Sequence, residues 1–330
     1  MSFVRYNTDD SVISSETVVR GMWSNDNSTL NTFYTSSLNN SSYYLNVYDS
    51  TATSSLQFSI QYGHVNGSGS ADMSLVEDIT PTRITYGQYR SLIYNDENSS
   101  FVFGNVVSPD FIALSIARSR FKESIKPGSL SLKLSGSAGF ILLTDDSVSN
   151  GSVSNFIGSN RYYTLVSGSR GIAYSTPLNS ISGSYGMLFP DLGVILLNPR
   201  ALSAAQAYGG LNETFNTSNG TPGNPNLSSM FNIIKASNSG SFIIQSQETV
   251  SSRYFFTRVK NNEFNYTTNP SIINTSGSLL YDTLIDNPQT YVTTVGMYND
   301  NNELLAVAKL SRPLIKDFTK EALVRIKLDY

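Results

Sequence analysis

The chain's one histidine, His64, is the first residue to consider for chemistry. A histidine that titrates near neutral pH serves as a general base or as a metal ligand. Both uses need partners, and the sequence contains no second histidine and no cysteine. Zinc ligand sets and Ser-His or Cys-His pairs therefore lack their components. We interpret His64, in "YGHVNGSGS", as a structural residue at the end of a strand.

Paired carboxylates are the second kind of residue to consider, because glycoside hydrolysis needs two Asp or Glu side chains at a set separation. The candidate pairs are Asp145 with Asp146, Glu77 with Asp78, Asp96 with Glu97, and Asp300 with Glu303. All but the first occur in polar turns or at helix ends, where solvated acids are ordinary. Adjacent acids also point to opposite sides of a strand. A carboxylate-based cell-wall hydrolase is therefore the least favoured function.

The glycine- and serine-rich stretches, such as "NGSGSAD" and "SGSAGF", lack the neighbouring lysine and following helix of a phosphate-binding loop. No phosphate-loop, dinucleotide-binding or nucleophile-elbow motif occurs. The sequence thus predicts no catalytic residue, no cofactor-binding residue and no metal ligand. We expect a protein that is not an enzyme and that uses no cofactor.

The composition favours a protein that binds partners over a protein that catalyses a reaction. Charged residues make up 14% of the chain, below the roughly 25% of typical globular proteins, while Tyr (20) and Phe (17) are abundant. We expect a polar, mostly uncharged surface of which partners cover large parts. A net charge of −3 disfavours nucleic acid as a partner. A membrane is not expected either, because no apolar run approaches the roughly 20 residues of a spanning helix.

The pattern of apolar residues predicts a mainly β fold with a few short helices, arranged as a β-sandwich or as meander-type sheets. Residues 1–40 are rich in Ser, Thr and Asn with scattered aromatics, so we favour an extended N-terminal docking arm over a disordered tail. Residues 41–250 are predicted to form a β-rich core domain with short helices. Residues 251–330 are predicted to form a C-terminal β region with a closing hairpin. We expect the chain to fold without the arm but not to assemble.

Helix signals occur in residues 80–96, 199–210 and 226–237. In the first segment Thr80 is a candidate cap and Pro81 occupies the first helical position. The apolar faces expected for the first and third segments are Ile84, Tyr89, Leu92 and Ile93, and Leu227, Met230, Phe231 and Ile234. Residues 111–121 partly meet both the helix and the strand spacing, so their structure stays open.

Strand signals occupy most of the remaining chain. Apolar residues alternate over residues 56–62 and 130–134, and short apolar runs broken by Gly, Ser and Asn predict a meander over residues 147–200. Residues 241–267 are predicted to form three strands. Near the end of the chain, "GMYNDNNELLAVAKL" (296–310) predicts an antiparallel hairpin around a four-residue polar turn.

The last ten residues, "EALVRIKLDY", predict an amphipathic strand. Val324, Ile326 and Leu328 would lie on one face, and the intervening charged residues on the other. We expect this strand to join the sheet of the hairpin. A helix through residues 303–310 is the weaker alternative to the second hairpin strand, which Pro313 would end.

Two segments, "FIALSIARSRFKESIKPGSLSLKLSG" (111–136) and "VGMYNDNNELLAVAKLSRPLIKDFTKEALVRIKLDY" (295–330), resemble virion structural proteins of T-even-like contractile-tailed marine phages of the cyanophage type. The similar features are an Arg-x-Arg-Phe-Lys segment with Pro-Gly before a strand of alternating Leu, and a closing hairpin with "LLAVAKLS", Pro and a basic amphipathic end. These motifs contain no catalytic residues. The resemblance implies a part of the tail or baseplate, built into a symmetric particle.

We therefore expect a structural component of a tailed-phage virion, with a tail or baseplate (wedge-type) position favoured. The alternatives are a neck or head-associated structural protein, and a receptor- or glycan-binding tail module in which exposed Tyr residues stack on sugars. The expected partners are other virion proteins in a symmetric assembly with multiple copies per particle. The expected location is the virion, after assembly in the host cytoplasm.

Overall fold

The fold is built mainly from antiparallel β-strands with short helices between them, as the sequence predicts. The computed structural model describes residues 5, 7–35, 44–50, 54–70, 80–137, 139–151, 154–174, 182–218, 225–235, 242–266 and 269–329. The chain forms two compact units: unit 1 is Met1–Glu16 with Thr249–Tyr330, and unit 2 is Thr17–Glu248. The division falls inside two strands, whereas the predicted boundaries lie after residues 40 and 250.

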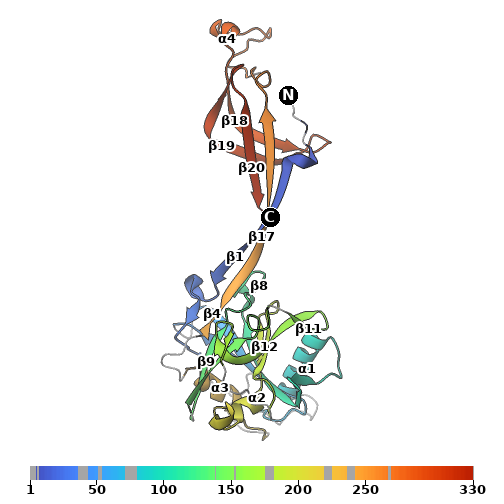
Figure 1. Cartoon of the computed structure of the whole chain (residues 1–330), viewed down its shortest axis with the longest axis vertical. Helices are drawn as coiled ribbons and strands as arrows, with labels where there is room; N and C mark the ends of the chain where they lie inside the picture. The colour runs from blue at the N-terminus through green and yellow to red at the C-terminus, as the bar shows by residue number, and fades with distance from the viewer. Residues whose placement is uncertain are drawn as a thin grey trace. The chain divides into compact units, whose positions relative to one another are not determined.

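Unit 2 contains a sheet with the strand order β2-β16-β9-β10-β12-β14-β15-β7-β4-β3, and β11 and β13 pair with β12 (Figure 1). Its strands are β2 (Thr29–Leu30), β3 (Leu45–Tyr48), β4 (Leu56–His64), β7 (Asp110–Ile116), β9 (Ser131–Gly136), β10 (Gly139–Asp145), β11 (Asn155–Ile157), β12 (Asn160–Ser169), β13 (Ile172–Ala173), β14 (Gly186–Phe189), β15 (Val194–Leu197) and β16 (Phe242–Ile243). A separate hairpin joins β5 (Phe101–Phe103) to β6 (Val106–Ser108).

The sheet curls until its two ends share one core. Phe58 lies on β4, near one end of the strand order, and Phe242 lies on β16, near the other, yet their ring centroids are 5.4 Å apart. Leu132 and Leu134 of β9 belong to the same buried cluster, as their predicted alternation indicates. A sheet of this many strands curls readily because adjacent strands twist in one direction.

Residues 111–121, whose structure the sequence leaves open, begin with strand β7. Its side chains are buried on both faces of the sheet: Ile112 and Leu114 belong to the main core, while Phe111 and Ala113 belong to a second cluster. Helix α1 (Pro81–Tyr94) supplies Tyr86 to that second cluster. The helix therefore covers one face of the sheet, which explains why β7 is apolar at nearly every position.

The three predicted helical segments contain α1, α2 (Pro199–Ser203) and α3 (Pro225–Lys235). The predicted apolar face of α3 is buried. In α1 the predicted Tyr89 and Ile93 are buried, together with Tyr86, whereas Leu92 is 49% exposed. Thr80 makes no side-chain cap. Asn226 is the second residue of α3, where its side-chain oxygen accepts a hydrogen bond from the Asn216 amide.

Part of the predicted docking arm belongs to the core of unit 2. Met22, Trp23, Leu30 and Phe33 are buried in the main cluster, and Leu30 pairs with Phe242 across β2 and β16. Residues 36–40 lie outside the described residues. The arm interpretation follows from local composition, but scattered aromatics with distant partners leave no local pattern that distinguishes a packed segment from a free one.

Unit 1 contains residues of a sheet with the order β1-β17-β20, and of the ribbon formed by β18 and β19 (Figure 1). The elements are β1 (Ser11–Gly21), β17 (Gln245–Val259), β18 (Thr290–Tyr298), β19 (Leu304–Lys316), β20 (Ala322–Asp329) and the short helix α4 (Thr283–Asp286). The short strand β8 (Ser124–Ile125) pairs with the first residues of β17, within unit 2. The sequence predicts three strands in residues 241–267. Within the described part of this range the structure has two strands, β16 and the long β17.

The closing hairpin forms as predicted, with residues 304–310 in a strand rather than a helix. Asn299 shapes the turn, because its side-chain oxygen accepts hydrogen bonds from the amides of Asn301 (3.0 Å) and Glu303 (2.8 Å). Two expectations are wrong. Strand β19 continues past Pro313 through an irregular register, and β20 pairs with β17 instead of the hairpin.

The ribbon of β18 and β19 packs on one face of the sheet, the face that carries the predicted apolar side chains of β20. Val324 and Ile326 of β20 are buried with Phe255 of β17, and Val295 and Met297 of β18 pack against them. Leu328 is half-buried on the same face, while Arg325, Lys327 and Asp329 are exposed. The hairpin thus covers the last strand by face-to-face packing, although it does not hydrogen-bond to it.

We expect Ile326→Ala to lower the free energy of unfolding of unit 1 by about 2 kcal/mol, because it removes aliphatic surface from a small core. Lys327→Glu should change it by less than about 1 kcal/mol, since Lys327 is exposed and its pair with Asp329 is solvated. Denaturant melts of the two variants provide the comparison. An equal loss of stability would contradict the amphipathic strand.

Candidate interaction surface

His64 is buried at the last position of β4, with 7% of its surface exposed. Its Nδ1 accepts hydrogen bonds from the amides of Asn66 (3.1 Å) and Ser68 (3.3 Å), so the neutral ring carries its proton on Nε2. Burial lowers the pKa of His64, and the charge of Asp110, its partner across β4 and β7, opposes this only in part. The ring therefore fixes the turn after β4.

This hydrogen bonding makes the stability of unit 2 depend on pH. Because the folded-state pKa of His64 lies below the unfolded value of about 6.5, its contribution is complete above that pH and declines as the pH falls below it. We expect the stability advantage of the native chain over His64→Gln to shrink in acid. Denaturant melts from about pH 8 to pH 5 test this, and a constant difference would contradict it.

Asp110 is held by neighbouring hydroxyl groups. The Tyr62 hydroxyl donates to its Oδ2 (3.0 Å) and the Ser108 hydroxyl donates to its Oδ1 (3.2 Å). Burial and the Asp110 carboxylate both raise the pKa of Tyr62, which therefore keeps its proton. Tyr62 of β4, Ser108 of β6 and Asp110 of β7 thus form a buried polar network, which no local sequence pattern predicts.

Asp145 and Asp146 are both occupied by hydrogen bonds in unit 2. Oδ1 of the fully buried Asp145 accepts from the Gly128 amide (2.8 Å) and from Ser147. Oδ1 of Asp146 accepts from the Thr164 amide (2.9 Å), and burial raises the pKa of this half-buried carboxyl. The two side chains brace the strand ends around β10 and β12.

The other carboxylate pairs are dispersed. Asp96 and Glu97 are exposed just after α1, and Asp300 and Glu303 are exposed in the hairpin turn. Glu77 and Asp78 lie outside the described residues. Within the described ranges, no group of three or more His, Cys, Asp or Glu side chains is placed to hold a metal ion. Of the helices in the described part of the chain, none is long and apolar enough to span a membrane.

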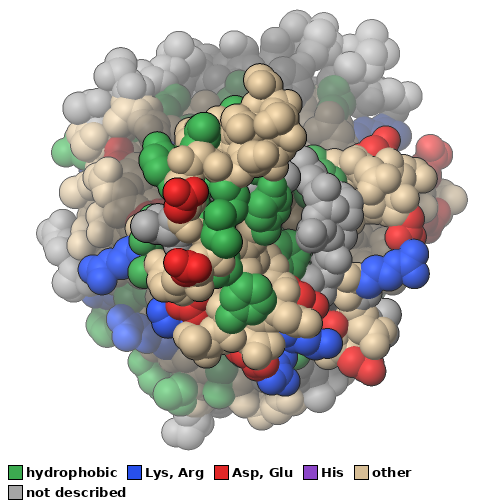
Figure 2. All heavy atoms as spheres, turned by 90° about the horizontal axis from the view of Figure 1, so that it is seen from above, with side chains coloured by type: hydrophobic (Ala, Val, Ile, Leu, Met, Phe, Trp, Pro, Cys, Tyr) green, Lys and Arg blue, Asp and Glu red, His purple; other side chains and the backbone are tan. Residues whose placement is uncertain are grey.

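Exposed apolar side chains are concentrated in unit 1. Three of its described apolar side chains are buried, and each of these keeps 8% of its surface exposed. The large apolar side chains of unit 1 that are at least 39% exposed are Val12, Ile13, Tyr266, Leu280, Tyr281, Ile285, Tyr291, Tyr298, Leu304, Leu305, Val307, Ile315, Phe318 and Leu323. Figure 2, which looks onto the end with α4, shows hydrophobic side chains side by side between acidic and basic ones.

The largest of these groups, here called the ribbon patch, lies on β18 and β19. Its members are Tyr291, Tyr298, Leu304, Leu305, Val307 and Ile315, which are between 39% and 64% exposed. Tyr291 faces Ile315 across the ladder, and Val307 faces Gly296. Because side chains alternate along a strand, Val307 points away from the core that its neighbour Ala308 contacts. The ribbon is therefore apolar on both faces.

The sheet of unit 1 also presents an aromatic outer face, here called the sheet patch. It consists of Tyr254 and Phe256 of β17, which are half-buried, and Leu323 of β20, which is 68% exposed. Arg325 and Lys327 lie over the Tyr254 ring, at 5.7 Å and 6.0 Å from its centroid. The sheet patch thus combines apolar surface with positive charge.

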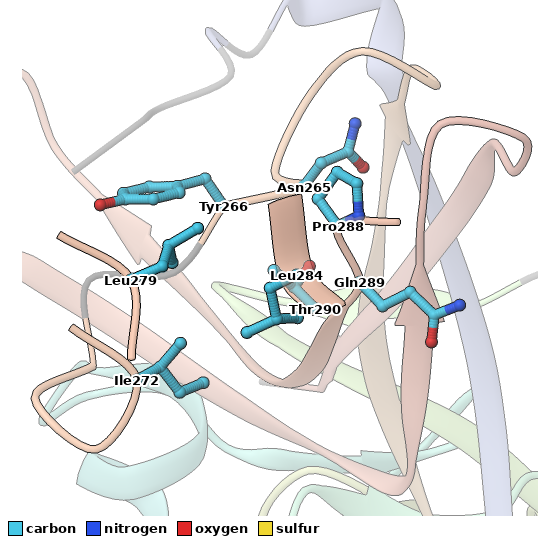
Figure 3. Close-up of a pocket in the computed structure, with 8 residues that line it drawn as sticks. All are labelled: Asn265, Tyr266, Ile272, Leu279, Leu284, Pro288, Gln289 and Thr290. Carbon is cyan, nitrogen blue, oxygen red and sulfur yellow. The ribbon is translucent and has the colours of Figure 1, made fainter. Parts of the chain in front are cut away.

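A shallow pocket lies in the loop region around α4. It is lined by Asn265, Tyr266, Ile272, Leu279, Leu284, Pro288, Gln289 and Thr290. Figure 3 shows Ile272, Leu279 and Leu284 together on one side, with the Tyr266 ring near them, while the Gln289 amide points away. The volume of the pocket is about 20 Å³, enough for about one water molecule. The exposed ring of Tyr266 makes it a shallow contact site rather than an enclosed cavity.

The loop before this pocket is fastened by Lys316, whose side chain is fully buried. Its Nζ donates to the Asn261 carbonyl (2.9 Å), to Asn265 Oδ1 (2.8 Å) and to the Asp317 carbonyl (2.9 Å). An ammonium has three donors, so all of them are satisfied by neutral acceptors. The geometry of this part of unit 1 therefore depends on one charged side chain.

The alternation of apolar residues in 303–310 predicts a strand but not the exposure of its outer side chains. An apolar residue at every position of a strand, as in "LLAV", is the one signal in the sequence that both faces of the ribbon are apolar.

No protein-family model, curated protein or solved structure matches the chain significantly.

Proposed function

We propose that this chain is a structural component of a tailed-phage virion, in the tail or baseplate, and that it acts through protein–protein interfaces of unit 1. The observation that carries the proposal is the ribbon patch, which places six large apolar side chains, each at least 39% exposed, on an ordered, hydrogen-bonded ribbon. Exposed contiguous apolar patches of this kind mark interaction sites in soluble proteins.

The physical reason is the imbalance within unit 1. Its buried apolar core is small, and many of its large apolar side chains are exposed. Covering the ribbon patch with a partner would remove apolar surface from water, which is favourable. The resemblance of residues 111–136 and 295–330 to virion proteins supports a phage particle as the place where this occurs, and the proposal assigns no catalytic role to any residue.

Quantitative mass spectrometry of purified particles tests the proposal. In intact particles of the phage that encodes the chain, we expect the chain at a fixed copy number relative to the tail sheath protein. The same ratio should be found in separate preparations and after particles are purified twice. Absence from purified particles, with the chain abundant in the lysate of infected cells, would contradict the proposal.

A second function, binding of a glycan receptor, is favoured by one observation. The Tyr266 ring lines the pocket near α4 and is 60% exposed, and Tyr281 is 57% exposed in the same loop region. Aromatic rings stack on the apolar faces of sugars. Binding to host-envelope polysaccharide that is lost in Tyr266→Ala, but retained in the control Tyr208→Ala of unit 2, would support this function.

A further inference from the structure

We propose that the partner of the ribbon patch is a second copy of this chain, and that the ribbon patch of one copy docks on the sheet patch of the next. This inference rests on the proposed function, because it names the partner of the same surface. It is carried by three independent features of unit 1: the small core, the complementary charges of the two patches and the area that they offer.

The small core of unit 1 makes association with a partner favourable. Phe255, Val324 and Ile326 are the buried apolar side chains of unit 1 among the described residues, and a unit with so little buried apolar surface is marginally stable alone. A partner that covers the ribbon patch would add to this stability, although the chain does not need it in order to fold. A second copy of the same chain supplies such a partner without a further component.

The charges of the two patches are complementary. Asp300 and Glu303 lie in the turn that joins the ribbon strands and are exposed, whereas Arg325 and Lys327 lie beside the sheet patch. The turn end of the ribbon thus offers apolar surface next to acids, and the sheet patch offers apolar surface next to two bases, of which Lys327 is also paired with Asp329 within its own chain. Unit 1 has ten Lys and Arg and eleven Asp and Glu, a net charge of −1, so copies repel each other little.

The areas are adequate for a specific contact. A stable interface covers about 800 Å² on each partner. A large side chain that is fully exposed offers about 150–250 Å², so the six partly exposed members of the ribbon patch offer about 500 Å². Flanking polar side chains supply the remainder. Val307 points away from the core on the ribbon side, and the sheet patch lies on the face of the sheet away from that core. The contact is therefore head-to-tail, and a head-to-tail contact that closes forms a ring.

Sedimentation velocity on the full chain tests the inference. We expect the native chain to sediment as an oligomer at about 10 μM. Val307→Asp in the ribbon patch and Leu323→Asp in the sheet patch should each raise the concentration for half-association by about tenfold or more, because each buries an unpaired charge in the contact. Val307 is 58% exposed and Leu323 is 68% exposed, so circular dichroism melts should show that both variants remain folded.

Mixing the two variants distinguishes the head-to-tail contact from every other arrangement. Val307→Asp keeps an intact sheet patch and Leu323→Asp keeps an intact ribbon patch, so an equimolar mixture should form a one-to-one dimer that neither variant forms alone. A mixture that stays monomeric, while the native chain is oligomeric, would overturn the head-to-tail contact.

A charge exchange provides a second test that does not depend on apolar variants. Asp300→Arg and Arg325→Asp should each weaken association, and the double variant should recover most of the loss. Lys235→Asp, at an exposed lysine of unit 2 outside both patches, serves as the control. A monomeric native chain at about 10 μM would overturn the inference, yet it would leave the proposed function intact if the chain were found in particles at a fixed ratio.

Discussion

Trp23→Ala is expected to lower the free energy of unfolding of unit 2 by about 3–5 kcal/mol, the cost of removing a large buried aromatic side chain. Trp23 is 2% exposed, and its Nε1 donates a hydrogen bond to the Phe242 carbonyl at 2.6 Å. Its ring centroid lies 4.8 Å from that of Phe242 and 6.1 Å from that of Phe58. Denaturant melts followed by tyrosine fluorescence, which both proteins retain, measure the loss.

The control is Tyr34→Ala, an aromatic residue from the same N-terminal segment that is 44% exposed. It should cost less than about 1 kcal/mol, as surface substitutions usually do. Equal and small effects from both substitutions would show that residues 17–35 are not part of the core and would restore the docking-arm interpretation for this segment.

Lys316→Met is expected to have the largest effect on unit 1, a loss of about 3 kcal/mol or more. Methionine fills a similar volume but leaves three partly or fully buried acceptors, on Asn261, Asn265 and Asp317, without a donor. Each buried polar group left unsatisfied costs about 1–3 kcal/mol. Hydrogen exchange measured by mass spectrometry should show faster exchange in residues 257–266 and in β19.

Lys309→Met is the matched control, because Lys309 lies on the same strand and is exposed. Its replacement should leave hydrogen exchange in residues 257–266 unchanged. If Lys316→Met exchanges like the native chain, water must satisfy the three acceptors, and the lysine is not what fastens the loop.

The sequence predicted features that depend on neighbouring residues. The alternation of Val324, Ile326 and Leu328 identified the buried face of β20, because a strand with one covered face must be apolar at every second position. The four polar residues at 299–302 identified the hairpin turn for a similar reason. In both cases the physical cause lies within a few residues of its effect.

Features that depend on distant residues could not be predicted. Trp23 is buried because Phe242 and Phe58 surround it, and neither lies near it in the chain. The predicted pairing of β20 with the hairpin was wrong for the same reason. The sequence predicts strands both in the hairpin and in residues 241–267, and no residue near β20 indicates which of them it joins. The burial of Lys316 is likewise invisible locally, because two of its three acceptors lie in a loop more than 50 positions earlier.

The sequence placed some of the candidate residues correctly in the fold but did not predict their contacts. His64 was expected at a strand end, where the structure places it, but its two amide partners in the following turn were not foreseen. The Asp145–Asp146 pair was set aside because adjacent acids point apart. The structure adds that both carboxylates are engaged by backbone amides, of Gly128 and Thr164.

Cysteine labelling at Val307 tests the central claim, that an assembly covers the ribbon patch. The native chain has no cysteine, so Val307→Cys creates a unique thiol. We expect maleimide to label it in intact particles about tenfold or more slowly than in the dilute isolated chain, because a covered side chain reacts only after local opening. The control Phe156→Cys in unit 2, and urea-denatured particles, calibrate reagent access. Equal labelling rates for Val307→Cys in particles and in the isolated chain would contradict the claim.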